Sequence, residues 1–277
     1  MKNVMQLKEI MKNIGKEKGI PAQVVLQNYI MERVLERISI SPYQTKFILK
    51  GGMLIASLVG IESRTTMDID ATMKNYALTE ENIRTAFTEI LSQDVDDGIT
   101  FKLIKITSIR EADQYEGYRV SLEAVFDTLV VLLKIDLTAG DKLTPDAINY
   151  HYKLLLEQRF IEILSYNIET ILAEKIETIV SRGVLNTRLR DYYDIYILNK
   201  LEATKIDYRL YVDAIAATSE RRESVEEIEK RKMVLETIKN SKVMKKRWED
   251  YQKEYGYAKE LSFYEVMIEV EKLVELI

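Results

Sequence analysis

Apolar side chains recur with helical spacing in the first forty residues of the chain. In VVLQNYIMERVLERISI they fall at roughly helical spacing, at Val25, Tyr29, Val34, Leu35 and Ile38. Pro21 precedes this run, at a helix start where its missing N–H costs little. The pattern therefore predicts a helical lead-in that ends before Pro42.

The pattern becomes mixed between residues 43 and 145. FILKGGMLIASLVG predicts a short entry followed by an apolar helix, and TEENIRTAFTEILSQ predicts a helix that starts at Thr79. TMDIDATM, ITFKLIKITSI and YRVSLEAVF alternate apolar and polar residues, which is typical of strands. TLVVLLKIDLTAG is rich in Val, Leu and Ile, so we expect a strand that is buried on both faces.

Helical periodicity returns after Pro145 and continues almost to the end, and no strand is predicted there. The expected fold class is therefore α+β. A helical lead-in and a small core with a mixed sheet would occupy residues 1–145, and a C-terminal helical bundle residues 146–277.

The composition is that of a soluble, packed protein. Apolar residues make up 47% of the 277 residues and charged residues 31%. The charged N-terminus is unlike a signal peptide, and no apolar run is long enough to cross a bilayer, so we expect a cytoplasmic protein without a membrane partner. The net charge of −5 argues against indiscriminate binding to polyanions but leaves a local basic patch open.

The chain offers few side chains for metal binding other than carboxylates. It has no cysteine, which excludes disulfides and thiolate sites. Its only histidine, His151, lies in AINYHYKLLLE on a predicted helix, where a structural or surface role is expected. Any metal must therefore be held by oxygen atoms, which suits Mg²⁺ or Mn²⁺.

Asp68 and Asp70 stand one residue apart in the predicted strand TMDIDATM. Residues i and i+2 of a strand point to the same face, so both carboxylates would project together while Ile69 faces the core. Two adjacent carboxylates repel each other unless a cation lies between them. A polar surface strand is the alternative, although aspartate is depleted in strands.

Lys134 and Asp136 repeat this spacing in LLKIDLTAG and interrupt a long apolar run. One interpretation is a buried ion pair between them. The other places Asp136 beside Asp68 and Asp70 as a third metal-binding carboxylate, with Lys134 neutralising phosphate charge. Three carboxylates around one or two Mg²⁺ ions would fit phosphoryl or nucleotidyl transfer.

Gly51 and Gly52 open the predicted apolar helix. Glycines at a helix start let the backbone approach a phosphate, although close helix packing explains them equally well. Arg64, Thr65 and Thr66 lead into the acidic strand. We assign Arg64 and Thr66 to nucleotide binding, with a surface arginine as the alternative for Arg64.

Two further groups lie in the predicted C-terminal bundle. Arg188, Asp191 and Asp194 share one helical face, which is also the pattern of a solvated salt-bridge face. Lys175 has no acidic residue three or four positions away, so it needs a partner from another element or must extend to water.

Four stretches together resemble a known family. LKGG with RTTMDID resembles the first motif of the DNA polymerase β-like nucleotidyltransferases, and LKIDLTAG the second motif of their AbiEii/AbiGii toxin branch. YNIETILAEKIETIV resembles its third motif and RLRDYYDIYIL its fourth, so the resemblance spans roughly residues 47 to 198. Gly52 replaces the usual serine, so backbone N–H groups would contact phosphate. Arg190 replaces the usual lysine before Asp191.

The resemblance implies a bacteriostatic toxin of an abortive-infection, phage-defence system. It would bind a nucleoside triphosphate, with GTP as the implied nucleotide, and transfer a nucleotidyl group to an acceptor such as tRNA. Lys175 and Arg188 would bind the nucleotide, and Asp191 would orient the attacking group or the base. We expect a monomer, and a cognate antitoxin that acts without a stable complex.

A basic segment, KNSKVMKKR, is the candidate RNA contact. Its candidate residues are Lys242, Lys245, Lys246 and Arg247, and Trp248 and Tyr251 could stack on a base. A solvated lysine-rich helix is the alternative. Two rival functions also stay open, a phosphotransferase that uses the same carboxylates and a non-enzymatic nucleotide-binding toxin.

Overall fold

The computed structural model of the protein describes residues 3–110 and 116–277. The chain divides into two units, each with its own core. The first comprises Met1–Asp141 and Ala147–Ser165, and the second comprises Lys142–Asp146 and Tyr166–Ile277.

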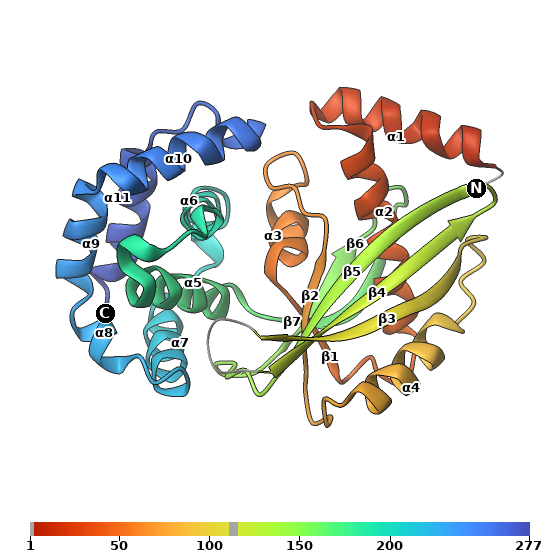
Figure 1. The fold of residues 1–277 in the computed structure, drawn as a ribbon, viewed down its shortest axis with the longest axis horizontal. Helices are drawn as coiled ribbons and strands as arrows, with labels where there is room; N and C mark the ends of the chain where they lie inside the picture. The colour runs from red at the N-terminus through yellow and green to blue at the C-terminus, as the bar shows by residue number, and fades with distance from the viewer. Residues whose placement is uncertain (1–2, 111–115) are drawn as a thin grey trace. The chain divides into compact units, whose positions relative to one another are not determined.

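The first unit contains four helices and a seven-stranded sheet within the described residues (Figure 1). Its helices are α1 (Val4–Lys18), α2 (Ala22–Ser39), α3 (Gly51–Val59) and α4 (Glu80–Leu91). Its strands are β1 (Phe47–Lys50), β2 (Ile69–Met73), β3 (Thr100–Arg110), β4 (Glu116–Phe126), β5 (Leu129–Ala139), β6 (Ile148–Lys153) and β7 (Phe160–Ser165).

The sheet is mixed, with the strand order β3-β4-β5-β2-β1-β7-β6. β2 runs parallel to β5 and β1 parallel to β7, whereas the other neighbours are antiparallel. The turn from β1 into α3 and the start of β2 therefore come together in the middle of the sheet, beside β5.

Local sequence explains where several helices begin. Asn3 caps α1 by accepting a hydrogen bond from the backbone N–H of Gln6, and Thr79 caps α4 in the same way through Asn82. Pro21 stands at the N-cap of α2, as expected for a residue without an N–H group. The helices and strands predicted before residue 145 are confirmed by α1 to α4 and β1 to β5.

β5 differs from the expectation of a strand buried on both faces. Its buried side chains alternate along one face of the sheet, where α2 packs: Val131, Leu133, Ile135 and Leu137. On the other face Val130 is 54% exposed and Leu132 is 69% exposed. Lys134 and Asp136 belong to this open face, so they do not interrupt a buried run.

The prediction that residues 146–277 contain no strand is wrong. β6 and β7 form an antiparallel pair that extends the sheet from β1, and His151 lies in β6 opposite Glu162 rather than on a helix. The segments INYHYK and FIEILS are short and rich in amphipathic side chains, so their alternation is weak evidence on its own. Pairing with β1 supplies the context that the sequence pattern lacks.

The second unit is helical throughout its described residues. Its α-helices are α5 (Ile168–Arg182), α6 (Leu189–Leu201), α7 (Tyr208–Arg221), α8 (Val225–Glu229), α9 (Arg231–Asn240), α10 (Lys242–Glu254) and α11 (Phe263–Val274). Short 3₁₀ turns are η1 (Gly183–Leu185), η2 (Ala203–Lys205) and η3 (Gly256–Ala258). Large buried side chains such as Tyr192, Tyr211 and Trp248 fill its core. The α+β class is thus confirmed.

None of the helices described in the two units combines the length and the apolar character that crossing a bilayer requires.

Candidate functional site

Four charged residues stand side by side across the central strands of the sheet. Lys50 of β1 is in register with Asp70 of β2, Asp70 with Asp136 of β5, and Asp136 with Arg119 of β4. Side chains in register on neighbouring strands share a face. Two carboxylates therefore lie in the middle of this row, and one cation stands at each end.

The cations at the ends of the row are already engaged by carboxylates. Arg119 donates from Nε and Nη2 to the two carboxylate oxygens of Asp136, at 2.7 Å each. Lys50 Nζ lies 2.7 Å from Oδ2 of Asp141, which also accepts from the hydroxyl of Thr138. Asp70 is left with the weakest compensation of the acidic groups in the row.

The pKa of Asp70 reflects this position. The pKa of Asp70 is raised to about 6, first by burial and then by the negative charges of Asp68 and Asp136, while Lys50 and the backbone N–H of Gly52 lower it. Like charges close together disfavour the ionised form, and a cation placed among them restores it. Asp68 lies in the bend that precedes β2 rather than in the strand, and metal binding by Asp68, Asp70 and Asp136 stays a prediction.

The glycine pair is shaped around Asp70. Gly51 has φ +65°, and a Cβ atom there would lie 2.1 Å from Oδ2 of Asp70. The backbone N–H of Gly52 donates to the same oxygen at 3.4 Å, and a Cβ on Gly52 would come within 2.8 Å of the Thr66 hydroxyl. Close packing is thus observed at both glycines, and phosphate contact by them stays a prediction.

The segment before β2 is held from inside the molecule. Arg64 is only 1% exposed, and its guanidinium donates to the carbonyl of Thr65, so it is not the surface arginine considered as an alternative. Thr66 donates to the carboxylate of Asp68 at 3.1 Å. Asn28 of α2 donates to the carbonyl of Thr66 at 3.0 Å and so fixes this segment.

Lys134 lies on the open face and lines a cavity of about 400 Å³ together with Asp68. The exposed apolar side chains of Ile104 and Leu132 form part of the same wall. The buried ion pair between Lys134 and Asp136 is not formed, because Asp136 binds Arg119 instead. A cavity with one acid, one amine and apolar walls can accommodate a flat, partly polar ligand.

The carboxylate oxygens in this region are the type of ligand that a hard divalent cation prefers. They are not arranged closely enough to coordinate such a cation. Asp68, Asp70 and Asp136 provide only oxygen ligands, and the pKa of Asp70 is raised chiefly by burial and also by the negative charges of Asp68 and Asp136. Within residues 3–110 and 116–277, no three acidic or histidine side chains are grouped closely enough to hold a metal. Asp136 would have to exchange its contact with Arg119 for a metal ligand.

A second polar cluster lies in the helical unit. Lys175 of α5 donates to Asp191 at 2.8 Å and to Asp194 at 2.7 Å, both on α6. Burial lowers the pKa of Lys175, but the two carboxylates outweigh this effect and hold it above its usual value. Arg188 Nε is 3.3 Å from Asp191 Oδ2. The predicted need of Lys175 for a partner outside its own helix is confirmed.

The candidate RNA residues on α10 separate into two groups. Lys242, Lys245 and Lys246 are exposed, and Lys246 pairs with Glu249 and Asp250 on its own helix. Arg247 instead donates inward to the carbonyls of Val184 and Asn186.

The suggestion that Trp248 stacks on a base is wrong. Its ring is 1% exposed, and its Nε1 donates to the carbonyl of Leu261 within the core. Tyr251 is also buried, at 7% exposure.

Sequence reasoning missed Arg119, Asn28 and Gln27 as parts of the site. Arg119 occupies a polar position of an alternating strand, but only the strand register places it opposite Asp136. Gln27 and Asn28 lie on α2, where they donate to backbone carbonyls before β2 and in β5. Polar residues on an otherwise apolar helical face are the signal that could have revealed them.

A family profile described as "Nucleotidyl transferase AbiEii toxin, Type IV TA system" matches residues 33–272. The chain belongs to the AbiEii family. The match includes the acidic row of the sheet and the Lys175 cluster, so the predicted family is confirmed over most of the chain. The AbiEii family implies a nucleotide substrate and a cognate antitoxin. A comparison with curated proteins gives no match.

Two solved structures from Helicobacter pylori are similar to this AbiEii-family protein. JHP933 has 14% identity and a TM-score of 0.54, and the alignment covers 92% of this chain and 91% of that chain. A candidate nucleotidyltransferase has 14% identity and a TM-score of 0.49 over 93% of this chain and 95% of that chain. The likeness to JHP933 concerns the fold alone.

Proposed function

We propose that this AbiEii-family toxin transfers a nucleotidyl group from a nucleoside triphosphate to an acceptor in a reaction that depends on Mg²⁺ or Mn²⁺. The observation that carries this proposal is the row across the sheet, in which Asp70 lies between Lys50 and Asp136 and is also subject to the negative charge of Asp68. Membership of the AbiEii family supports nucleotidyl transfer as the reaction. The row of charged residues indicates which carboxylates take part in it.

In this proposal Asp68, Asp70 and Asp136 hold the metal. When bound, a divalent cation would neutralise the triphosphate and assist the attacking hydroxyl. To act as a metal ligand, Asp136 would give up its hydrogen bonds with Arg119. Arg119 then keeps its positive charge beside the phosphates, since a guanidinium stays protonated at neutral pH.

The remaining residues bind and orient the nucleotide. The backbone N–H groups at Gly51 and Gly52 and the amine of Lys134 contact phosphate oxygens. Thr66 and the buried Arg64 hold the segment that carries Asp68 in place. The cavity beside Asp68 receives the base or the ribose against Ile104 and Leu132.

The reaction forms one bond and breaks one. An acceptor hydroxyl attacks the α-phosphorus, the bond from this phosphorus to the bridging oxygen of the β-phosphate breaks, and pyrophosphate leaves. The hydroxyl proton passes to a carboxylate of the site or to water. We propose GTP as the donor and tRNA as the acceptor, with an antitoxin that acts without a stable complex.

Label transfer tests the proposal directly. Wild-type protein, Asp68→Asn and the exposed control Asp213→Asn are incubated with each α-³²P-labelled nucleoside triphosphate, Mg²⁺ and total cellular RNA. We expect label on RNA with the wild type and the control, and a loss of about 100-fold or more in Asp68→Asn. Growth inhibition on expression should follow the same order.

The same experiment separates the two rival functions. A phosphotransferase would transfer label from γ-³²P-labelled and not from α-³²P-labelled triphosphate. A non-enzymatic nucleotide-binding toxin would transfer neither the α-³²P nor the γ-³²P label. Its wild-type form and its Asp68→Asn variant would inhibit growth to the same extent. Either result overturns the proposed reaction.

A further inference from the structure

Arg119 holds the carboxylate that the proposed metal site needs as its third ligand. Its Nε and Nη2 donate to both oxygens of Asp136 at 2.7 Å each. Paired, charge-assisted hydrogen bonds of this kind are among the stronger ones in proteins. In the two described stretches of the chain, no three acidic or histidine side chains are close enough to hold a metal. The guanidinium and a metal ion would therefore compete for the same carboxylate.

The charge of Arg119 acts on all three carboxylates of the proposed site. Its hydrogen bonds to Asp136 raise the pKa of Arg119 above the usual value, and burial opposes this effect. The negative charges of Asp136, Asp68 and Asp70 raise the same pKa further. A positive charge that is attracted by these three carboxylates repels a divalent cation that approaches them. Arg119 thus opposes metal binding by repulsion as well as by its hold on Asp136.

The backbone of Arg119 is fixed, but its guanidinium is not enclosed. β4 is paired on both sides, so that Thr107 of β3 and Asp136 of β5 lie opposite Arg119. The side chain of Arg119 is 39% exposed, whereas that of Asp136 is only 16% exposed. Rotation about side-chain bonds can therefore move the guanidinium to a ligand on the open face of the sheet while Asp136 stays in place.

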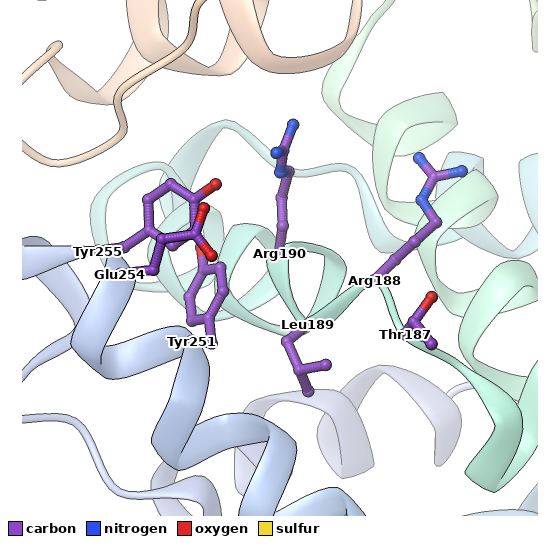
Figure 2. Close-up of a pocket in the computed structure, with 7 residues that line it drawn as sticks. All are labelled: Thr187, Arg188, Leu189, Arg190, Tyr251, Glu254 and Tyr255. Carbon is purple, nitrogen blue, oxygen red and sulfur yellow. The ribbon is translucent and has the colours of Figure 1, made fainter.

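The arginines at the cavity of the helical unit have partners of another kind (Figure 2). This cavity, of about 470 Å³, is lined by Arg188 and Arg190 among other residues. Arg188 Nε is 3.3 Å from Asp191 Oδ2, and Arg190 is hydrogen-bonded to the side chain of Tyr255. Asp191 and Tyr255 are not among the proposed metal ligands. Competition with a metal for one carboxylate is therefore expected at Arg119 and not at these two arginines.

A triphosphate is a ligand that can draw Arg119 away from Asp136. A guanidinium binds two phosphate oxygens with the same paired geometry that it uses for a carboxylate. The triphosphate also brings several negative charges to the site. A metal ion alone brings positive charge and offers the guanidinium no new partner. Freeing Asp136 therefore costs less after the triphosphate has bound than before.

We propose that Arg119 makes metal binding conditional on the triphosphate. Without a triphosphate, Arg119 holds Asp136 and disfavours the metal. When phosphates reach the site, the guanidinium binds them, and Asp136 becomes available as the third carboxylate ligand. Arg119 is thus a triphosphate-binding residue and a positioning residue for Asp136. The inference rests on the proposed function, because the metal ligands are taken from there.

The binding of each ligand alone gives the first test. Mn²⁺ binding to the full chain is measured by electron paramagnetic resonance without nucleotide, and binding of a non-hydrolysable triphosphate analogue by calorimetry in EDTA. Arg119→Gln removes one positive charge, so it should bind Mn²⁺ about 5- to 20-fold more tightly and the triphosphate about 5- to 20-fold more weakly. A general disturbance of the site would weaken both. Arg84→Gln, an exposed arginine paired with Glu80 in the same unit, is the matched control and should change neither affinity.

Asp136→Asn tests the release of Arg119. This variant holds the guanidinium less strongly, so it should bind the triphosphate in EDTA severalfold more tightly than wild type. The double variant Arg119→Gln/Asp136→Asn should lose this gain and also the gain in Mn²⁺ affinity. Arg119→Lys keeps the charge but not the paired hydrogen bonds, so it should lie between wild type and Arg119→Gln in both measurements. Melting curves show whether each variant is folded, and Arg119→Lys and Asp136→Asn keep the test valid if Arg119→Gln unfolds.

The inference is wrong if Arg119→Gln shifts the two affinities in the same direction or changes neither. An unchanged Mn²⁺ affinity would mean that the metal uses Asp136 without displacing Arg119. Either result, together with label transfer by the wild type, rejects this inference alone. If Mn²⁺ does not bind even with the triphosphate present, the proposed metal-dependent reaction fails, and this inference fails with it.

Discussion

Acidic side chains gather in both units, and the two clusters are compensated in opposite ways. In the sheet, Asp70 lies between Lys50 and Asp136, and its pKa is raised to about 6, chiefly by burial and also by the negative charges of Asp68 and Asp136. In the helical unit, Asp191 and Asp194 close on the buried Lys175 at 2.8 and 2.7 Å. In the second cluster Lys175 binds both carboxylates, whereas in the sheet Arg119 binds Asp136 and Lys50 binds Asp141, so Asp70 has no direct ion pair of its own among the described contacts.

This difference leads us to expect a role in folding for the Lys175 cluster and a role in ligand binding for the carboxylates of the sheet. A cluster that is already neutralised contributes to folding and loses stability when its cation is removed. A cluster of like charges lowers the stability of the ligand-free protein. Such clusters are common at functional sites, where a bound ligand compensates the charge. The two clusters should therefore respond with opposite sign to removal of a charge.

The largest expected effect is that of Lys175→Met. It leaves Asp191 and Asp194 buried without their ammonium partner, so the free energy of unfolding should fall by about 3–5 kcal/mol. Urea unfolding measures this change, with the exposed Lys245→Met as the matched control. A loss below about 1 kcal/mol would mean that the cluster is not held together by Lys175.

Gly51→Ala should have the next largest effect, and Gly19→Ala is its control. Both glycines have a positive φ, +65° and +67°, but only at Gly51 does an added Cβ collide with Asp70. Gly19→Ala should cost about 1–2 kcal/mol for the left-handed backbone alone. Gly51→Ala should cost clearly more in thermal unfolding, and equal costs would show that Asp70 can move away freely.

Asp70→Asn should stabilise the protein, by at most about 3 kcal/mol at pH 8 in EDTA. The native state binds the Asp70 proton more tightly than the unfolded state does, so the wild-type free energy of unfolding falls as pH rises from about 4 to about 6. The variant loses this dependence, so its advantage should vanish near pH 4. A variant that is less stable than wild type at pH 8 would contradict the strain assigned to Asp70.

Local patterns in the sequence predicted much of this arrangement. The glycine pair was correctly predicted to open a helix, and TMDIDATM to form a strand, although the strand begins only at Ile69, because alternation and apolar runs are properties of short segments. The need of Lys175 for a distant partner was also readable, since its own helix offers no acid. Asp191 and Asp194 stood on one helical face in the sequence, as they do in α6.

What could not be predicted depends on pairing between distant segments. The register that sets Arg119 opposite Asp136 joins β4 to β5, and no local pattern specifies it. The open face of β5 was hidden because an apolar strand reads as buried unless one knows which face the helices leave uncovered. β6 and β7 were missed because they join the sheet through the pairing of β7 with β1, which is distant in the sequence.

We propose that Asp70 and its acidic neighbours in the sheet bind a divalent cation and that the Lys175 cluster does not. Melting temperature is followed during titration with Mg²⁺ at a fixed concentration of a non-hydrolysable triphosphate analogue. We expect Mg²⁺ to stabilise the wild type and Asp194→Asn, by about 2.7 kcal/mol at 100 times the dissociation constant, and not to stabilise Asp70→Asn. Equal stabilisation of wild type and Asp70→Asn would contradict it.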